Sequence, residues 1–245
     1  ILCEGVTRLV AEAGVTIRTR TAVAGLSRAN GRIQSVDLAD GERIEADLVV
    51  SSIPTEVYMG MVPEDQTEQL ASIRYTALVS VIAASRKRVS PDFYWMNLAS
   101  LDRAACGVFL LNSLNPSIGA PGDSCVNFVT HLNSRSRPFF AKSDDELIAA
   151  YLEDFRAIFG FDLDPHWTNV ARVPMYSPVF NRGYRNPPPR SSTLANVYFA
   201  GNYRTFPSVV STGTALLSGL ETADVILRSH GLPPGEAAAA RGFRS

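Results

Sequence analysis

The residues with the clearest potential for chemistry lie where an apolar run stops at a glycine and a helix begins soon after. Val197–Ala200 predicts a short buried strand that ends at Gly201. The segment Thr212–Arg228 predicts a helix, and Ser211 or Thr212 can cap its N-terminus. The unpaired amides and positive dipole of a helix N-terminus favour an anionic or electron-rich group. The alternative is ordinary packing of the helix on a sheet without a ligand. When this stretch is considered alone, ordinary packing is the favoured interpretation.

One face of this helix carries only small residues. Ala215, Gly219 and Ala223 recur at every fourth position, which places them on the same side of the helix. A flat or bulky group can therefore approach the helix backbone closely along this side. The spacing adds a second reason to consider a bound ligand here, beside the helix N-terminus.

Other kinds of site find little support in the sequence. The cysteines and histidines are scattered, so we predict free thiols and no metal site. Neither a catalytic triad nor a paired-carboxylate motif is present. The net charge of −1 gives no basic excess, which argues against nucleic-acid binding, and no apolar run is long enough to span a membrane. The scattered residues are Cys3, Cys106, Cys125, His131, His166 and His230.

The first part of the chain predicts a helix, a β-meander and one buried strand. Asn30-Gly31 is a strong signal for a two-residue hairpin turn, and Asp40-Gly41 predicts a second turn. The apolar run before Pro54 predicts a buried parallel strand. The predicted elements are a helix over 1–13, strands over 15–18, 21–29 and 32–39, and the parallel strand over 47–51.

The middle of the chain predicts a mixed sheet flanked by helices. Ser143 caps a helix whose apolar residues recur at i, i+3 and i+4 as far as Phe159, and Gly160 ends it. Asn186–Ser192 predicts a stiff, exposed connector. We expect short helices over 55–60 and 64–73, and strands over 76–84, 93–98, 107–111, 125–132 and 170–176.

Two distant parts of the chain resemble the flavin-dependent amine oxidase superfamily. That superfamily includes monoamine and polyamine oxidases, phytoene desaturases and protoporphyrinogen oxidases. Residues 197–226 (VYFAGNYRTFPSVVSTGTALLSGLETADVI) resemble its C-terminal signature, although Asn202 replaces a frequent acidic residue and Thr214 a frequent glycine. The segment 170–184 resembles a family segment that returns toward the flavin, with Pro178 at its usual proline. A front pattern is matched by Gly14-Val15, Ile17, Thr21, Val23, Asp40-Gly41, Ala46-Asp47, Val49-Val50 and Pro54.

The resemblance implies a site for non-covalent FAD. Gly201 and Asn202 would lie near the diphosphate and ribityl chain, and the amides of Thr214, Ala215 and Leu216 would face the flavin O2 and N1. Since residues 201–213 contain no cysteine, there is no basis for a covalent thioether. The implied cofactor residues are Val23, Ser52, Pro54, Gly201, Asn202, Gly213, Thr214, Ala215 and Leu216.

The same resemblance implies residues near the substrate. Tyr176, Tyr203 and Phe206 would line the substrate cavity, with plain packing as an equal alternative for each. Some relatives use a lysine near the flavin N5. Lys87 and Lys142 lie outside the matched segments, so we assign no catalytic residue.

The implied fold is α/β and α+β: an incomplete FAD-binding domain of the Rossmann-like, glutathione-reductase type, with an inserted mixed-sheet substrate domain. Residues 1–54 and 190–230 would form the FAD-binding domain, 55–189 the substrate domain, and 231–245 a disordered tail. The sequence contains no GxGxxG and no Gly-x-Gly. We therefore expect the missing N-terminal FAD-binding segment upstream in a longer protein or on another chain.

The implied function is that of an FAD-dependent oxidoreductase, inactive as this chain alone, in the cytoplasm or peripheral to a membrane. It would remove a hydride from a C–N or C–C bond of an organic, apolar small-molecule substrate. A UDP-galactopyranose-mutase-like flavin isomerase is an alternative and would need clustered arginines, for which Arg182, Arg185 and Arg190 are candidates. A cofactor-free binding or partner subunit is a third reading, supported by the absent glycine loop.

Overall fold

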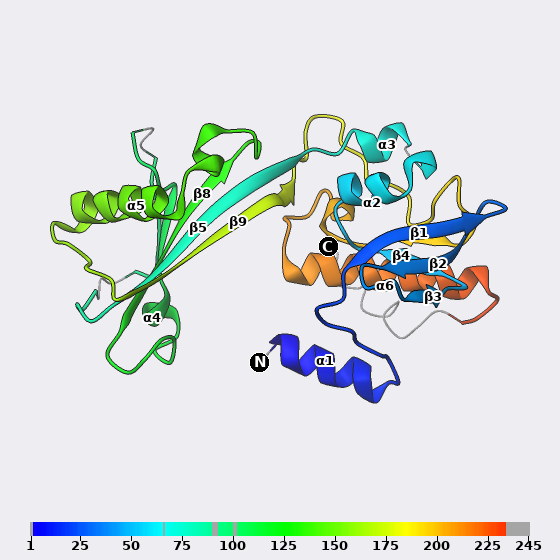
Figure 1. Cartoon of the computed structure of the whole chain (residues 1–245), viewed down its shortest axis with the longest axis horizontal. Coiled ribbons are helices and arrows are strands. Elements are labelled where there is room, and N and C mark those ends of the chain that lie inside the picture. Colours follow the sequence, from blue (N-terminus) through cyan, green and yellow to red (C-terminus); the bar gives the residue numbers. More distant parts are fainter. Residues whose placement is uncertain (1, 66, 90–92, 100–101, 234–245) are drawn as a thin grey trace. The chain divides into compact units, whose positions relative to one another are not determined.

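The chain divides into two units, one of which is built from two separate stretches of sequence. The computed structural model describes residues 2–65, 67–89, 93–99 and 102–233 (Figure 1). The first unit comprises residues 1–72 and 185–245, and the second comprises residues 73–184. The boundaries expected at residues 54 and 189 differ from these, because Tyr58 packs edge-on against Phe199 and Asp65 bonds Ser191, which ties residues 55–72 to the first unit.

The first unit contains two small sheets. Its antiparallel meander turns at Asn30 and Gly31, whose φ angles are 53° and 70°, as the hairpin signal predicts. A second sheet pairs β4 with β10 in parallel, which confirms the parallel strand predicted before Pro54. The strands are β1 (Val23–Ala29), β2 (Arg32–Leu38), β3 (Arg43–Glu45), β4 (Val49–Ser51) and β10 (Val197–Phe199).

Helical elements complete the first unit, and one of the predicted helices is broken. The helix predicted over 64–73 is interrupted, because Thr67 begins a new element by accepting a hydrogen bond from the Leu70 amide. The helices are α1 (Leu2–Glu12), α2 (Thr55–Met61), α3 (Glu68–Ala71) and α6 (Thr212–Ser229). The short 3₁₀ turns are η1 (Pro63–Asp65) and η3 (Asn202–Arg204).

A buried asparagine joins the two sheets of the first unit. Asn196 Oδ1 accepts the Ile33 amide at 2.9 Å, and its Nδ2 donates to the oxygens of Ile33 at 2.8 Å and Asp47 at 3.0 Å. The two bonds to Ile33 are buried and the bond to Asp47 is half-buried, so this one side chain fixes the meander against the segment that leads into β4.

The second unit is a five-stranded sheet in the order β6-β7-β8-β5-β9, with α5 packed on one face (Figure 1). All of its described strand pairs are antiparallel, so the mixed sheet expected from the sequence is wrong. Leu147, Tyr151 and Phe155 of α5 join the apolar core formed with the strands. The strands are β5 (Tyr75–Ser85), β6 (Trp95–Asn97), β7 (Gly107–Leu110), β8 (Ser124–Leu132) and β9 (Trp167–Pro178). The helical elements are α4 (Leu111–Leu114), η2 (Pro138–Ala141) and α5 (Asp144–Phe159).

Helix α5 begins and ends where the sequence predicts. Ser143 and Glu146 form a reciprocal capping box, in which Ser143 Oγ accepts the Glu146 amide and Glu146 Oε2 accepts the Ser143 amide. The hydrogen bond from the Ser143 amide to the Glu146 carboxylate lowers the pKa of that carboxylate. Gly160 ends the helix in the left-handed conformation, with φ at 79°.

Two further local predictions need correction. Residues 15–18 form no strand, because no strand pairs with them and Val15 and Ile17 lie exposed. The strand predicted over 107–111 is confirmed as β7, which ends one residue earlier, at Leu110, and α4 begins at Leu111. Strand β4 is less buried than its apolar run predicts, since Val50 is exposed.

Of the tail predicted to be disordered, residues 234–245 lie outside the described residues. Within the described part of the chain, every helix is too short or too polar to cross a bilayer.

Candidate cofactor site

Two parallel strands bring the predicted site segments to one edge of their sheet. In the pairing of β4 with β10, Ser51 lies opposite Phe199, and the Ala200 amide donates to Ser51 O at 3.0 Å. Ser52 comes after the end of β4 and Gly201 comes after the end of β10. The two residues therefore lie at the same edge of the sheet, although they are far apart in the sequence. Carboxyl ends of parallel strands are the usual place for a ligand in such sheets.

Gly201 occupies a position that requires glycine. Its φ and ψ angles of 135° and 179° lie in a region that only glycine adopts readily. A Cβ atom there would lie 3.1 Å from the Tyr203 ring and 3.3 Å from Ser52 O. The Gly201 amide donates to Ser218 Oγ at 2.8 Å, which fastens the turn to α6.

Hydroxyl groups and one buried arginine hold α6 against the strand. Thr222 Oγ1 donates to Phe199 O at 2.7 Å, and Arg204 Nη1 donates to the same oxygen at 3.0 Å. Arg204 Nε also donates to Pro187 O at 3.0 Å, and burial lowers the pKa of this guanidinium. Sequence reasoning missed these residues. The i, i+4 spacing of Ser218 and Thr222 was the available signal for a polar packing face.

The free amides of α6 lie earlier than the sequence resemblance implies. Thr214 N donates to Ser211 Oγ at 3.1 Å, and Ala215 N donates to Ser211 O at 3.0 Å. The cap therefore already uses two of the amides expected to face a ligand. Within the described part of the chain, the Thr212 and Gly213 amides have no acceptor. These two amides are the ones available to an anionic or electron-rich group.

An apolar surface lies on the side of α6 that does not pack on the strand. Leu216 is 50% exposed, and Leu217 and Leu220 are also exposed. At Gly219 a Cβ atom would meet nothing within 4 Å, so the small side of the helix is open as well. The buried Ser51 Oγ, at the end of β4, has no hydrogen-bond partner among the described residues. A flat apolar ring with a polar edge fits these groups.

The remaining predicted cofactor residues all lie in the first unit. Val23 is exposed at the start of β1, Pro54 precedes α2, and Asn202 begins η3. Val23 and Gly201 belong to the same unit, as a jointly built site requires.

The three aromatic residues predicted near the substrate have different surroundings. Tyr203 lies in the core of the first unit, where its hydroxyl donates to Ser51 O at 3.1 Å, so it supports the end of β4. Phe206 is exposed in the same unit, and Asn186 holds its backbone at both N and O. Tyr176 is exposed on β9 of the second unit.

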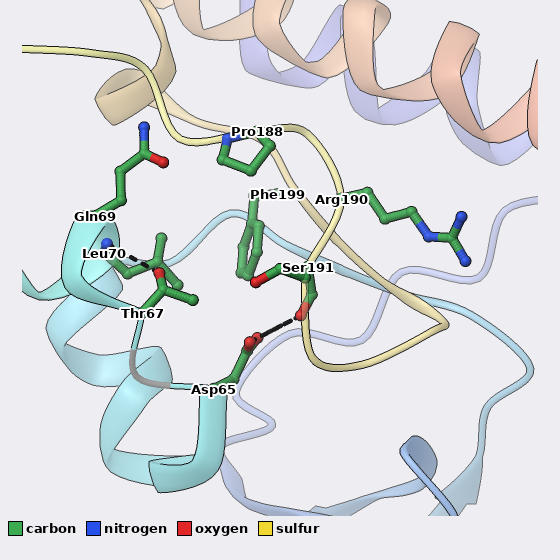
Figure 2. Close-up of a pocket in the computed structure, with 9 residues that line it drawn as sticks. Asp65, Thr67, Gln69, Leu70, Pro188, Arg190, Ser191 and Phe199 are labelled. Carbon is green, nitrogen blue, oxygen red and sulfur yellow. Dashed lines mark hydrogen bonds between the residues drawn. The ribbon is translucent and has the colours of Figure 1, made fainter.

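A separate cavity of about 160 Å³ lies beside η1 and α3 (Figure 2). The fully buried Asp65 carboxylate accepts the Tyr58 hydroxyl at 2.6 Å, Ser191 Oγ at 2.8 Å and the Thr193 hydroxyl. Gln69 Nε2 donates to Asn186 O, and the Arg190 side chain points away from the cavity in Figure 2 and donates to Ala195 O. Since these polar groups bond the protein itself, the cavity marks a structural tie rather than a ligand site.

A mixed α/β fold with a helix N-terminus beside the ends of parallel strands is an arrangement that many nucleotide-binding proteins share. The sequence matches the model of the flavin-containing amine oxidoreductases over residues 4–227, and the chain belongs to this family. The cofactor of the family is FAD. In the first unit, the Thr212 and Gly213 amides and the apolar side of α6 are the groups that could hold the flavin end of that cofactor. The glycine loop that holds the diphosphate in such domains does not occur in this sequence.

Solved structures with the same fold are about twice as long as this chain. A candidate protoporphyrinogen oxidase from Exiguobacterium sp. 255-15 is 17% identical with a TM-score of 0.70, over 92% of this chain and 51% of that one. Reduced UDP-galactopyranose mutase is 12% identical with a TM-score of 0.67, over 95% and 51%. A redesigned putrescine oxidase is 14% identical with a TM-score of 0.62, over 91% and 52%. No curated protein sequence matches the chain.

Proposed function

We propose that this chain forms part of an FAD-dependent oxidoreductase that removes a hydride from a C–N or C–C bond of an organic, largely apolar substrate. The observation that carries the proposal is the start of α6, where the free amides of Thr212 and Gly213 adjoin the exposed apolar side chain of Leu216. FAD, when bound, accepts the hydride and later passes the electrons to an acceptor. The α6 dipole favours negative charge at the ring edge that it faces.

A further segment completes the cofactor site in this proposal. A glycine loop is needed for the diphosphate, and it would come from upstream in a longer protein or from another chain. The first unit has many exposed apolar side chains, and this segment would cover some of them in the complete protein. They include Leu9, Val15, Ile17, Val23, Val50, Ile53, Val57, Val209, Leu216, Leu217 and Leu220. The 245-residue chain alone would then be inactive.

Flavin absorbance tests the proposal in the complete protein. We expect a bound-flavin spectrum that bleaches under anaerobic conditions when an oxidisable substrate is added, and that returns with oxygen or another acceptor. An uncharged polyene, a porphyrinogen and putrescine form a suitable first panel. A complete protein that takes up no FAD overturns the proposal and leaves the cofactor-free binding subunit. Translation of the DNA upstream of Ile1 is the companion test for the glycine loop.

A flavin isomerase is a second candidate, favoured by the structural similarity to UDP-galactopyranose mutase. The arginines considered for the diphosphate of a UDP-sugar do not support it. Arg190 lies over the Tyr198 ring at 5.9 Å and donates to Ala195 O, and Arg182 belongs to the other unit. Turnover of UDP-galactopyranose by the chemically reduced protein would favour the isomerase over the oxidoreductase.

A further inference from the structure

The five strands of the second unit carry almost no charge. Arg172 is the only charged residue in β5, β6, β7, β8 and β9. Its guanidinium donates to Asp144 Oδ1 at 2.6 Å and to Phe140 O at 3.2 Å, which places it on the side covered by α5. The opposite face of the sheet, which we call the open face, therefore has no charged side chain on any strand.

Strand register shows which residues share the open face. One row crosses the whole sheet through Trp95, Phe109, Asn127, Ile82 and Asn169. The next two rows contain Val129, Ser80 and Ala171, and then His131, Leu78 and Val173. The side chains that alternate with these on β5, β7 and β8 are fully buried under α5 and its neighbours.

The open face is uncharged and mostly apolar, and the polar residues in these rows are Asn127, Asn169, Ser80 and His131. An antiparallel sheet with one solvated face normally alternates apolar and polar side chains. Here Trp95 is 49% exposed, and its ring stacks on Phe109 with the ring centres 5.5 Å apart. Trp167 lies two residues before Asn169 on β9 and is 51% exposed. His131 contacts the exposed ring of Tyr176 at 5.3 Å, and desolvation lowers the pKa of its imidazole, which favours the neutral form. This combination suits an uncharged occupant, since any charged group would lose water without a counter-charge.

One polar group is oriented within this apolar surface. Ser80 Oγ donates to Asn127 Oδ1 at 2.7 Å, which fixes the orientation of the Asn127 amide. Its Nδ2 group has no acceptor among the described residues, and it lies in the central row between Phe109 and Ile82. A half-buried donor of this kind selects for an oxygen acceptor on the molecule that covers it.

We propose that the open face binds an uncharged, mainly apolar organic molecule, and that Asn127 donates a hydrogen bond to a hydroxyl or carbonyl oxygen of that molecule. This proposal rests on the proposed function in one respect: it assumes that the molecule bound on the open face is the substrate. It separates a neutral substrate from a protonated amine, for which the face offers no carboxylate.

Tryptophan fluorescence tests this, because Trp95 and Trp167 both lie on the open face and their variants show which part of the signal comes from it. In the complete protein, 1-decanol should shift the emission to shorter wavelength and saturate. Decylamine at pH 7 has the same chain with a positive charge, and it should bind at least tenfold more weakly. The variants Trp95→Phe and Trp167→Phe should each lose part of the shift, which assigns the signal to this face.

A matched pair of variants tests the role of Asn127. Asn127→Asp replaces the donor by a charged acceptor and should weaken 1-decanol binding about tenfold. Asn133→Asp makes the same change on an exposed loop and should leave binding unchanged. Equal binding of decylamine, equal effects of the two variants, or no response to 1-decanol would overturn the proposal. The fluorescence readout requires no flavin reduction, so failure of the proposed function is recognised separately.

Discussion

Gly201 shows how a single residue can define the geometry of the site. Its backbone conformation is open to glycine alone, and the space where a Cβ would lie is filled by Tyr203 and the Ser52 carbonyl. The resemblance to a flavoenzyme signature identified Gly201 from sequence. The reason that it must be glycine, the close approach of β4, became visible only when strands distant in the sequence were paired.

Gly201→Ala should lower the free energy of unfolding by roughly 2 kcal/mol, through backbone strain and steric conflict. Gly219→Ala is the matched control, because a Cβ there meets nothing within 4 Å and α6 is helical at that position. We expect the control to be neutral or stabilising by about 0.5–1 kcal/mol. Urea unfolding monitored by circular dichroism measures both variants, and equal destabilisation would contradict the assignment.

At the scale of elements, the two longest helices begin with the same device in different units. Ser143 caps α5 and Ser211 caps α6, and each forms a reciprocal pair with the third residue of its helix. In α6 this cap also decides which amides remain free, because Ser211 engages both Thr214 N and Ala215 N. The start of α6 thus serves both helix stability and, in the proposed function, the flavin edge.

Ser211→Ala and Ser143→Ala should each cost about 1 kcal/mol of stability, since both remove an N-cap acceptor. Only Ser211→Ala should also weaken retention of FAD by the complete protein, because α6 alone adjoins the proposed site. Thermal unfolding gives the stability of each variant, and flavin released on gel filtration gives retention. If Ser143→Ala released as much flavin as Ser211→Ala, the loss would reflect stability alone.

Sequence patterns predicted the long, strongly periodic elements and failed where tertiary bonds decide. Helix α5, strand β8 and the Asn30-Gly31 turn follow from local signals. Helix α4 does not, because the bonds of Asn112 to Ile118 and Cys125 hold that short turn in place. The apolar residues 15–18 have strand propensity but no partner strand, so propensity alone was insufficient.

The candidate site was predicted in outline only. Local patterns and the resemblance located Gly201 and the start of α6, because a strand, a glycine and a capped helix leave a readable trace. They did not identify Asn196, Arg204 or Asp65, whose partners lie far away in the chain. Buried polar residues of this kind are defined by three-dimensional contacts, which a single sequence does not record.

At the scale of the whole molecule, tyrosines buried in both units should make folding sensitive to alkaline pH. Desolvation raises the pKa of Tyr58, Tyr151 and Tyr184 above the ordinary value of 10.0. Above about pH 10 the unfolded chain therefore releases protons that the folded chain retains, so the free energy of unfolding falls as the pH rises.

Absorbance at the phenolate band measures this linkage. Part of the eight tyrosines of the chain should ionise only together with the loss of far-ultraviolet circular dichroism. The urea-unfolded chain is the control and should titrate all of them near pH 10. Complete ionisation near pH 10 in a chain that keeps its native dichroism would show that the Tyr58 and Tyr151 rings are not buried as described.

The two units of the molecule present different surfaces and would have different roles in the proposed function. The first unit presents free helix amides and an apolar helix side beside the β4–β10 edge, and the second presents an uncharged sheet face. Since the chain spans about half the length of the solved structures with its fold, the complete protein is the proper object of each functional test.

The FAD content of two leucine variants of the complete protein shows whether the flavin lies at the start of α6. Leu216 lies on the open side of α6 and is 50% exposed, while Leu232 lies just beyond α6 and is 53% exposed. The account predicts about one FAD per chain for the wild type and Leu232→Asp, and little or none for Leu216→Asp, with all three folded by circular dichroism. Full FAD content in Leu216→Asp would contradict the assignment of the flavin to the start of α6.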